Sequence, residues 1–264
     1  MKTMPTAHEA LLSDLDPLPR AIVAIATDYP PGHLLDWHEH RRAQLLYGAT
    51  GTMLVETADG AWTVPPERAV AIPPETPHRV RMLDVVTNSL YLEPSAVPWW
   101  PQECTVVEVS ALLRELLAAA VRMPAEYDLA GRDGALAALL LHELHELAPL
   151  PFHISLPRTP EFVRLCRAYL REPDAGVSNA EWARTLAMSE RSFTRAFRAD
   201  VGESPAAWRM RARLLAALPL LQQHTVTEVA MQLGYSSPAS FSAAFTHTFG
   251  RAPSALSGPR VTRR

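Results

Sequence analysis

The sequence predicts a two-domain α+β protein: an N-terminal antiparallel β-barrel followed by two helices, then a C-terminal all-α domain with two helix-turn-helix units. Three observations predict this fold. Short β-prone runs separated by Pro, Gly and Asp fill residues 21–94, apolar helical stretches lie between 110 and 147, and a motif after residue 183 occurs twice. With 264 residues, 48% of them hydrophobic, the chain can bury two cores of ordinary size.

Seven strands are expected in the N-terminal domain, after an arm over residues 1–20. They cover residues 21–27, 44–47, 52–57, 62–64, 70–72, 79–82 and 86–92. Asp59-Gly60 lies between two of these runs and is typical of a tight hairpin. Short strands at this spacing favour an antiparallel barrel or sandwich, and one more strand is expected at 105–109.

Three histidines are expected to converge inside this barrel. His38, His40 and Gln44 share the spacing G-x5-H-x-H-x3-Q-x6-G, and His78 ends a P-x-E-x-x-H segment. Alternate residues of a strand face the same side, so we expect His38 and His40 to point inward together, with His78 arriving from another strand. These side chains suit a divalent ion such as Zn²⁺, Fe²⁺, Ni²⁺ or Mn²⁺. The alternative is a metal-free polar pocket whose histidines contact a ligand directly.

Two apolar helices are predicted after the strands, over Ser110–Met123 and Asp133–Leu147, with Ser110 as the N-cap of the first. Because a barrel covers only one face of such helices, the other face is expected to meet a second chain in a homodimer. His142 and His145 are three residues apart and lack the i, i+4 spacing of zinc proteases, so a solvated or interfacial helix face is expected there. The proline-rich residues 149–159 are expected to form the domain linker.

The C-terminal region contains two copies of one unit, over residues 183–205 and 230–253. The recurring residues are Ala183, Leu186, Ser189, Phe193, Ala196, Phe197, Gly202 and Pro205, which return as Ala230, Leu233, Ser236, Phe241, Ala244, Phe245, Gly250 and Pro253. Their offset of 47 becomes 48 after one inserted residue. Each copy predicts a short helix, a tight turn, a serine N-cap and a second helix that buries Phe at i and i+4.

A long helix from Pro205 to about Gln223 is expected to join the two copies, with Pro205 in its first turn. Pro219 lies inside this stretch, where proline removes a backbone hydrogen bond, so a kink or an end is expected near Leu218. Such an interruption changes the spacing between the two units.

Charge divides the chain into a basic C-terminal part and an acidic remainder. From Arg158 onward there are 15 arginines against eight acidic residues, a net charge of +7, whereas residues 1–157 carry −10. The basic C-terminal part is therefore suited to binding DNA phosphates, whereas the acidic N-terminal part is repelled by them. The alternative, a duplicated helical bundle that does not bind nucleic acid, leaves this separation of charge without a role.

The duplicated residues resemble the DNA-binding domain of the AraC/XylS transcription regulators over residues 160–256, most closely in VTEVAMQLGYSSPASFSAAFTHTFGRAP. The resemblance implies binding to double-stranded promoter DNA, with RNA polymerase as a candidate partner, and activation and repression remain alternatives. We expect the first unit to read bases and the second to hold the DNA backbone. The candidate residues are Arg191, Ser192, Thr194, Arg195 and Arg198 in the first unit, and Ser237, Ser240, Thr246, His247 and Arg251 in the second.

The histidine-containing residues resemble the two cupin motifs over residues 32–82, with Gln44 in place of the usual Glu and with Glu67 and Glu75 in place of Gly. The resemblance implies a cupin-like sensor and dimerisation domain over residues 21–148, followed by the linker 149–159, the DNA-binding domain 160–256 and a tail 257–264. AraC-type regulators with cupin-like sensors commonly dimerise through the helices that follow the barrel.

These predictions combine into a transcription regulator, not an enzyme, whose effector is a small molecule, a metal or both. A metal-dependent cupin enzyme fused to a DNA-binding module is the alternative, but no catalytic acid–base pair accompanies the histidines. An architectural DNA binder whose barrel only dimerises is a third possibility, and it leaves the histidines unexplained. The sequence has no apolar run of about 18 residues and no signal-peptide layout at its start, so a cytoplasmic protein without membrane contact is expected.

Overall fold

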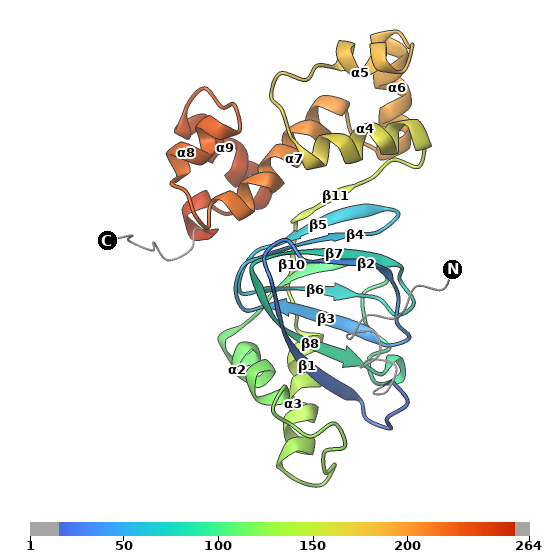
Figure 1. Cartoon of the computed structure of the whole chain (residues 1–264), viewed down its shortest axis with the longest axis vertical. Coiled ribbons are helices and arrows are strands. Elements are labelled where there is room, and N and C mark those ends of the chain that lie inside the picture. Colours follow the sequence, from blue (N-terminus) through green and yellow to red (C-terminus); the bar gives the residue numbers. More distant parts are fainter. Residues whose placement is uncertain (1–15, 257–264) are drawn as a thin grey trace. The chain divides into compact units, whose positions relative to one another are not determined.

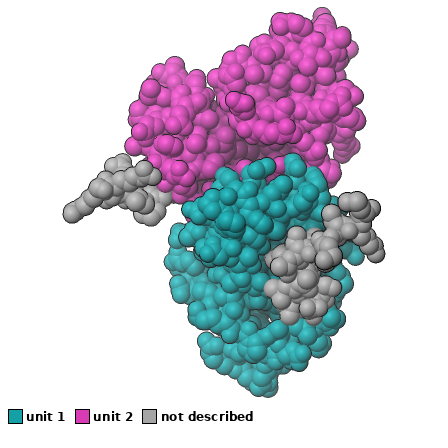
Figure 2. All heavy atoms as spheres, viewed as in Figure 1, with its two compact units in different colours: residues 1–50, 67–150 teal, residues 51–66, 151–264 magenta. Residues whose placement is uncertain are grey.

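The computed structural model describes residues 16–256, which form two compact units (Figures 1 and 2). Unit 1 comprises residues 1–50 and 67–150, and unit 2 comprises residues 51–66 and 151–264. Most of the predicted arm and all of the predicted tail lie outside the described residues. The units do not follow chain order, because residues 51–66 group with the C-terminal helices.

Unit 1 contains a six-stranded antiparallel sheet. Its strands, in spatial order, are β1 (Ile22–Tyr29), β8 (Val85–Leu92), β3 (Ala43–Gly48), β6 (Arg68–Ile72), β9 (Thr105–Glu108) and β10 (Pro149–Leu150). A second antiparallel pair in this unit joins β2 (Leu34–His38) to β7 (His78–Leu83). The strands belong to two sheets that do not close into a barrel, and this cupin-like jelly roll fits the predicted cupin-like fold class.

Two helices, α2 (Ala111–Ala120) and α3 (Arg132–His145), pack against the six-stranded sheet (Figure 1). Their buried leucines, among them Leu113 and Leu140, share one core with Leu45 and Leu90 of the sheet. The predicted N-cap is confirmed, since the Ser110 hydroxyl accepts a hydrogen bond from the backbone N–H of Leu113 at 3.0 Å. A short 3-10 helix η1 (Pro94–Ala96) precedes Trp100, whose indole N–H donates to the carbonyl of Ile72.

Two glutamates stand where the cupin motifs have glycine, and both adopt the left-handed backbone that glycine favours. Glu67 has φ 57° and Glu75 has φ 54°. A left-handed conformation costs a residue with a Cβ about 1–2 kcal/mol. Glu67 and Glu75 therefore keep the left-handed backbone conformation of the motif glycines, although neither residue is a glycine.

Unit 2 begins with three antiparallel strands. β4 (Thr52–Glu56) and β5 (Gly60–Val64) form the predicted hairpin, which turns at Ala58-Asp59, one residue before Asp59-Gly60, and β11 (His153–Ser155) pairs with β5. The segment predicted as a linker thus contributes strands, and helix α7 (Pro205–Leu220) contacts it. The Trp208 indole N–H donates to the carbonyl of Ser155 at 2.8 Å.

The remaining helices of unit 2 form two groups at opposite ends of α7 (Figure 1). One group contains α4 (Pro160–Arg171), α5 (Asn179–Thr185) and α6 (Glu190–Val201), and the other contains α8 (Val226–Gln232), α9 (Pro238–Phe249) and the 3-10 helix η2 (Pro253–Leu256). The connecting helix α7 runs through Pro219 and ends at Leu220, three residues before the predicted end. The helix therefore continues past Pro219 instead of ending at Leu218, and the backbone N–H of Leu221 still donates to the carbonyl of Ala217.

Both helix-turn-helix units have the same turn. In the first, the backbone N–H of Met188 donates to the carbonyl of Ala183, and in the second Tyr235 donates to Ala230, both at 2.9 Å. The second N-cap differs from the prediction by one residue, because Ser237 and not Ser236 caps α9. The inserted residue therefore lies before the cap, and α6 and α9 correspond at an offset of 48 throughout.

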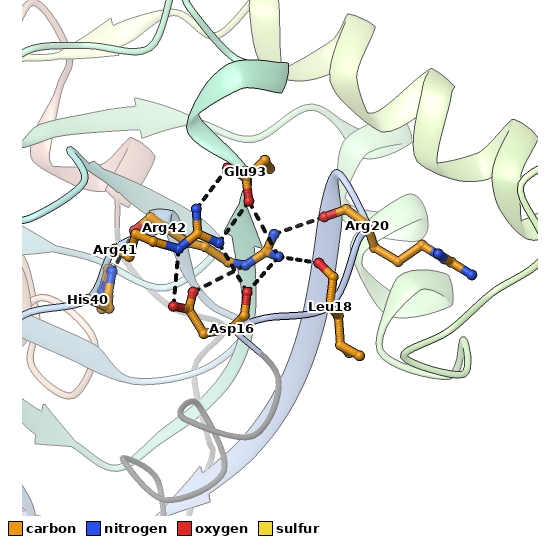
Figure 3. Close-up of polar contacts among 7 residues, drawn as sticks. All are labelled: Asp16, Leu18, Arg20, His40, Arg41, Arg42 and Glu93. Atoms are coloured by element: carbon orange, nitrogen blue, oxygen red, sulfur yellow. Dashed lines mark hydrogen bonds and ion pairs between the residues drawn. The ribbon is translucent and has the colours of Figure 1, made fainter.

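Two adjacent arginines hold residues 16–20 against the start of β3 (Figure 3). The Arg42 side chain is 3% exposed, and its guanidinium donates to the backbone carbonyls of Asp16, Leu18 and Arg20. Arg41 is 44% exposed and forms a bidentate pair with Glu93, with both N–O distances at 2.8 Å. Hydrogen bonds from Arg41 lower the pKa of the Glu93 carboxyl.

Replacing Arg42 with alanine is expected to lower the free energy of unfolding by about 2–4 kcal/mol, because it leaves three carbonyls without their charged donor. Arg41→Ala is the matched control, with an expected loss of about 0–1 kcal/mol for an exposed ion pair. Urea unfolding of the two variants measures the difference. Equal losses would show that burial of the Arg42 guanidinium has no energetic consequence.

Candidate functional site

The three predicted histidines lie together in unit 1. His38 and His78 are directly opposite each other across the β2–β7 pair, and their ring centroids are 4.3 Å apart. His40 lies 5.2 Å from His78 and 6.3 Å from His38 by the same measure. The structure therefore brings the three imidazoles into one cluster, which we call the histidine cluster.

His40 reaches the cluster by a route other than the predicted one. Strand β2 ends at His38, so His40 lies in the loop before β3 and does not follow strand alternation. Its ring is held instead by a hydrogen bond from Nδ1 to the carbonyl of Arg42 at 2.6 Å. The buried Arg42 thus fixes His40 through its backbone.

Each ring of the histidine cluster has its Nδ1 atom on a backbone carbonyl. The partners are Asp36 for His38 at 2.7 Å, Arg42 for His40 at 2.6 Å and Thr76 for His78 at 2.8 Å. A carbonyl only accepts, so Nδ1 carries the proton and Nε2 keeps its lone pair. The Nε2 atom of His78 is buried and has no hydrogen-bond partner within the described residues.

Gln44 completes the cluster from β3. Its Oε1 atom lies 3.1 Å from the Nε2 atom of His40, and its Nε2 atom donates to the Tyr91 hydroxyl at 2.9 Å. Two atoms that only accept face each other at the His40 contact, and a cation between them satisfies both. An amide turned by 180° satisfies them without a cation, because the Gln44 NH₂ then donates to His40.

Burial keeps the imidazoles of His78 and His40 neutral. It is the largest cause that lowers the pKa of His78 to about 3, and the neighbouring His38 lowers it further. Burial also lowers the pKa of His40. Neutral imidazole is the form that binds metal.

The histidine cluster can offer nitrogen donors, but it is not closed around a metal position. Within residues 16–256, no three His, Cys, Asp or Glu side chains are placed as a ready metal site. The separation of His38 from His40 is the widest in the cluster. His142 and His145 are exposed, as predicted, and the His145 ring packs on Trp99 at 4.8 Å.

A second candidate site lies on the outer face of α6 in unit 2. Arg191, Arg195 and Arg198 are exposed there, whereas Phe193 and Phe197 on the opposite face are fully buried. Thr194 is half-buried, and the Ser192 hydroxyl accepts from the N-cap Ser189 at 2.9 Å. Among the predicted contact residues of α6, the three arginines therefore have the side chains that can reach furthest into a DNA groove.

The corresponding helix α9 presents shorter side chains. Ser237 and Ser240 form a capping box in which the Ser240 hydroxyl accepts from the backbone N–H of Ser237 and donates to its carbonyl. Thr246 and His247 are exposed, and Arg251 is half-buried after the helix. Two of the predicted contact residues thus have their hydroxyl groups committed to the N-terminus of α9.

Comparison with known families assigns both regions. Residues 21–191 match the AraC-like ligand binding domain, and residues 182–258 match a helix-turn-helix domain. The chain belongs to the AraC-type transcription regulators. The sequence-based expectation of a regulator rather than an enzyme is confirmed by these matches.

The chain is similar to one curated regulator and to several solved structures. The HTH-type transcriptional regulator NimR of Escherichia coli is 29% identical over 221 residues, which cover 82% of this chain and 80% of NimR. Among solved structures, ToxT from Vibrio cholerae, bound to a methylnaphthalenyl butenoic acid, has 9% identity and a TM-score of 0.37, with coverage of 89% of this chain and 98% of ToxT. The DNA-binding domain of AdpA in complex with a target DNA has 30% identity and a TM-score of 0.33, with coverage of 35% and 85%.

Sequence reasoning missed some residues of both sites. Tyr91 touches Gln44 because β3 and β8 pair in a register that places the two residues opposite each other. Ala239 and Ala243 are exposed on α9 at positions that carry arginine in α6. The internal repeat contains the signal for the alanines, whereas no local pattern indicates Tyr91.

Among residues 16–256, no helix combines the length and apolarity that crossing a membrane requires.

Proposed function

We propose that this regulator binds specific promoter sequences in double-stranded DNA and that a ligand of the histidine cluster changes its affinity for them. The ligand is a small molecule, a divalent transition metal or both. The observation that carries the sensor part of the proposal is the shared Nδ1–carbonyl hydrogen bonding of three clustered imidazoles, which leaves a lone pair on each Nε2 atom, with that of His40 3.1 Å from Gln44 Oε1. Its place of action is the cytoplasm, where promoter DNA is accessible.

The donor types of the cluster suit a metal, although within residues 16–256 they are not arranged as a ready site. Zn²⁺, Fe²⁺, Ni²⁺ and Mn²⁺ accept imidazole nitrogen, and His38, His40 and His78 would supply it with Gln44 as an oxygen donor. Backbone carbonyls on the three Nδ1 atoms are the outer contacts that fix the tautomer of metal-binding histidines. The ion would supply a positive charge to which an anionic or oxygen-containing effector binds. Without the ion, the same Nε2 atoms accept hydrogen bonds from a polar effector.

The ligand controls DNA affinity only if it binds one arrangement of the regulator more tightly than another. Promoter contacts are proposed for Arg191, Arg195 and Arg198 on bases, and for Thr246, His247 and Arg251 on the DNA backbone. A ligand that stabilises the arrangement able to bind DNA raises affinity, and one that stabilises the other arrangement lowers it. Both activation and repression are consistent with this scheme.

The metal part of the proposal predicts a defined stoichiometry. Protein purified without a histidine tag is expected to hold about one transition-metal ion per chain, and His78→Ala to lose it, because removing one of three imidazoles weakens binding by 10-fold or more. Elemental analysis and the thermal shift on adding each metal measure this. His142→Ala, which removes an exposed histidine, is the control. No metal in the unaltered protein, together with no thermal shift, would leave the metal-free polar pocket as the sensor.

We also propose that two copies associate through α2 and α3. Leu112 on α2 is 49% exposed and Leu139 on α3 is 41% exposed, although each helix buries leucines on its other side. A two-fold dimer matches paired DNA half-sites and leaves surface for RNA polymerase. Sedimentation equilibrium tests the proposal, and a monomer at every concentration would exclude it.

A further inference from the structure

The two second helices of the repeat present different chemistry at equivalent positions. With the offset of 48, Arg191 corresponds to Ala239 and Arg195 to Ala243, and Arg198 corresponds to Thr246. The alignment is fixed by structure at both ends, since Ser189 and Ser237 are the N-caps and Gly202 and Gly250 are the left-handed C-caps.

The equivalent residues lie on the same outward face. All six side chains are exposed, and the phenylalanines of both helices are buried on the other side. Phe193 and Phe197 match Phe241 and Phe245, and each of the four is fully buried. The face that carries three arginines in α6 therefore carries two alanines and one threonine in α9.

This difference decides what each helix can read. A guanidinium donates two hydrogen bonds to O6 and N7 of guanine, whereas an alanine methyl group can neither donate nor accept. The apolar group that the major groove displays is the C5-methyl of thymine, and alanine and the threonine methyl are suited to contact it. The Ser240 hydroxyl is already engaged in the capping box, so it does not add a competing polar contact.

Short side chains also permit a close approach. Contact between methyl groups needs the two carbon atoms within about 4.0–4.5 Å, which a helix bearing arginines on that face reaches less readily. Ala239 and Ala243 are one turn apart on α9, so their methyl groups stand side by side along the groove.

We infer that α9 reads thymine through methyl contacts at Ala239 and Ala243, with Thr246 beside them, while α6 reads guanine. The operator is then asymmetric for each chain, with a guanine-containing segment under the first unit and a thymine-containing segment under the second. This inference rests on the DNA binding proposed above, and it replaces a purely backbone-holding role for the second unit.

Thymine methyl groups can be removed singly, which gives a direct test. Duplexes selected from a random-sequence library by the full-length protein serve as the probe, and deoxyuridine replaces each thymidine in turn. We expect one or two replacements to weaken binding about fourfold each, the effect of losing one buried methyl-sized group. The Ala243→Gly variant is expected to be insensitive to one of these replacements and to bind the unmodified duplex as weakly as the unaltered protein binds the substituted one.

A second variant covers the case in which glycine disturbs the helix. Ala243→Arg restores the arginine of the first unit and is expected to change the selected base at one position from thymine to guanine. Failure to select any sequence would defeat the proposed function itself. Selection of a clear site in which deoxyuridine has no effect at any position, or in which Ala243→Arg leaves the base preference unchanged, would overturn the thymine inference alone.

Discussion

Arg195→Ala is expected to lower affinity for the selected operator by roughly 5- to 150-fold, the loss that follows removal of one bidentate contact to guanine. Arg195 lies in the middle of the exposed face of α6, between Arg191 and Arg198. We also expect a weaker preference for guanine at one base pair, because the alanine methyl group cannot replace the hydrogen bonds of the guanidinium. Fluorescence anisotropy with the operator and its single-base variants measures both effects at a fixed salt concentration.

Arg164→Ala is the matched control for this prediction. Arg164 is exposed on α4, not on the recognition helix, and pairs with Glu161 at 3.2 Å. Its removal takes away the same charge, so a small and uniform change over all sequences is expected. If both variants lost affinity equally and kept the same base preference, α6 would contribute charge alone and the assignment of base reading to Arg195 would be wrong.

Gly234→Ala is expected to destabilise the second helix-turn-helix unit by about 2–4 kcal/mol, from a left-handed backbone and a steric overlap. Gly234 has φ 73°, and an added Cβ would lie 2.5 Å from the Cβ of Ala175. Hydrogen exchange followed by mass spectrometry locates the effect, since peptides from α8 and α9 should exchange at least tenfold faster. Operator binding should weaken together with this protection.

The first unit supplies the comparison for the glycine substitution. Ala187 occupies the equivalent turn with φ 53°, so it already carries the strain that Gly234 avoids. Ala187→Gly is expected to change stability by no more than about 1 kcal/mol, because relief of strain offsets the added freedom of the unfolded chain. A large loss in Ala187→Gly and none in Gly234→Ala would show that packing, not backbone conformation, determines these turns.

Neighbouring residues in the sequence were enough to predict features that form within one helix or strand. Ser110 and Ser189 cap the helices predicted for them, and all seven runs predicted as strands are strands. Strand β2 was missed because its residues, LLDWH, lack β-branched side chains and mix one buried leucine with exposed neighbours. Strand β11 is only three residues long and forms through pairing with β5, far away in the chain.

The histidine cluster shows the same division between local and long-range determinants. The residue types and spacing identified His38, His40 and His78, but the reason given for His40 was wrong because β2 ends before it. The contact of His38 with His78 depends on strand register, which a bulge between Leu35 and His38 shifts. The Arg42 carbonyl fixes His40, and the guanidinium of the same residue donates to carbonyls of residues 16–20, contacts that no spacing in the sequence indicates.

The central claim is that one chain holds DNA with two helix-turn-helix units, and hydroxyl-radical footprinting of the full-length protein on its selected operator tests it most directly. Two recognition helices on one face of the duplex predict two protected stretches for each bound chain, with centres about 34–36 Å or one helical turn apart. A single protected stretch per chain would contradict this account, because it would leave α9 without a place on the DNA.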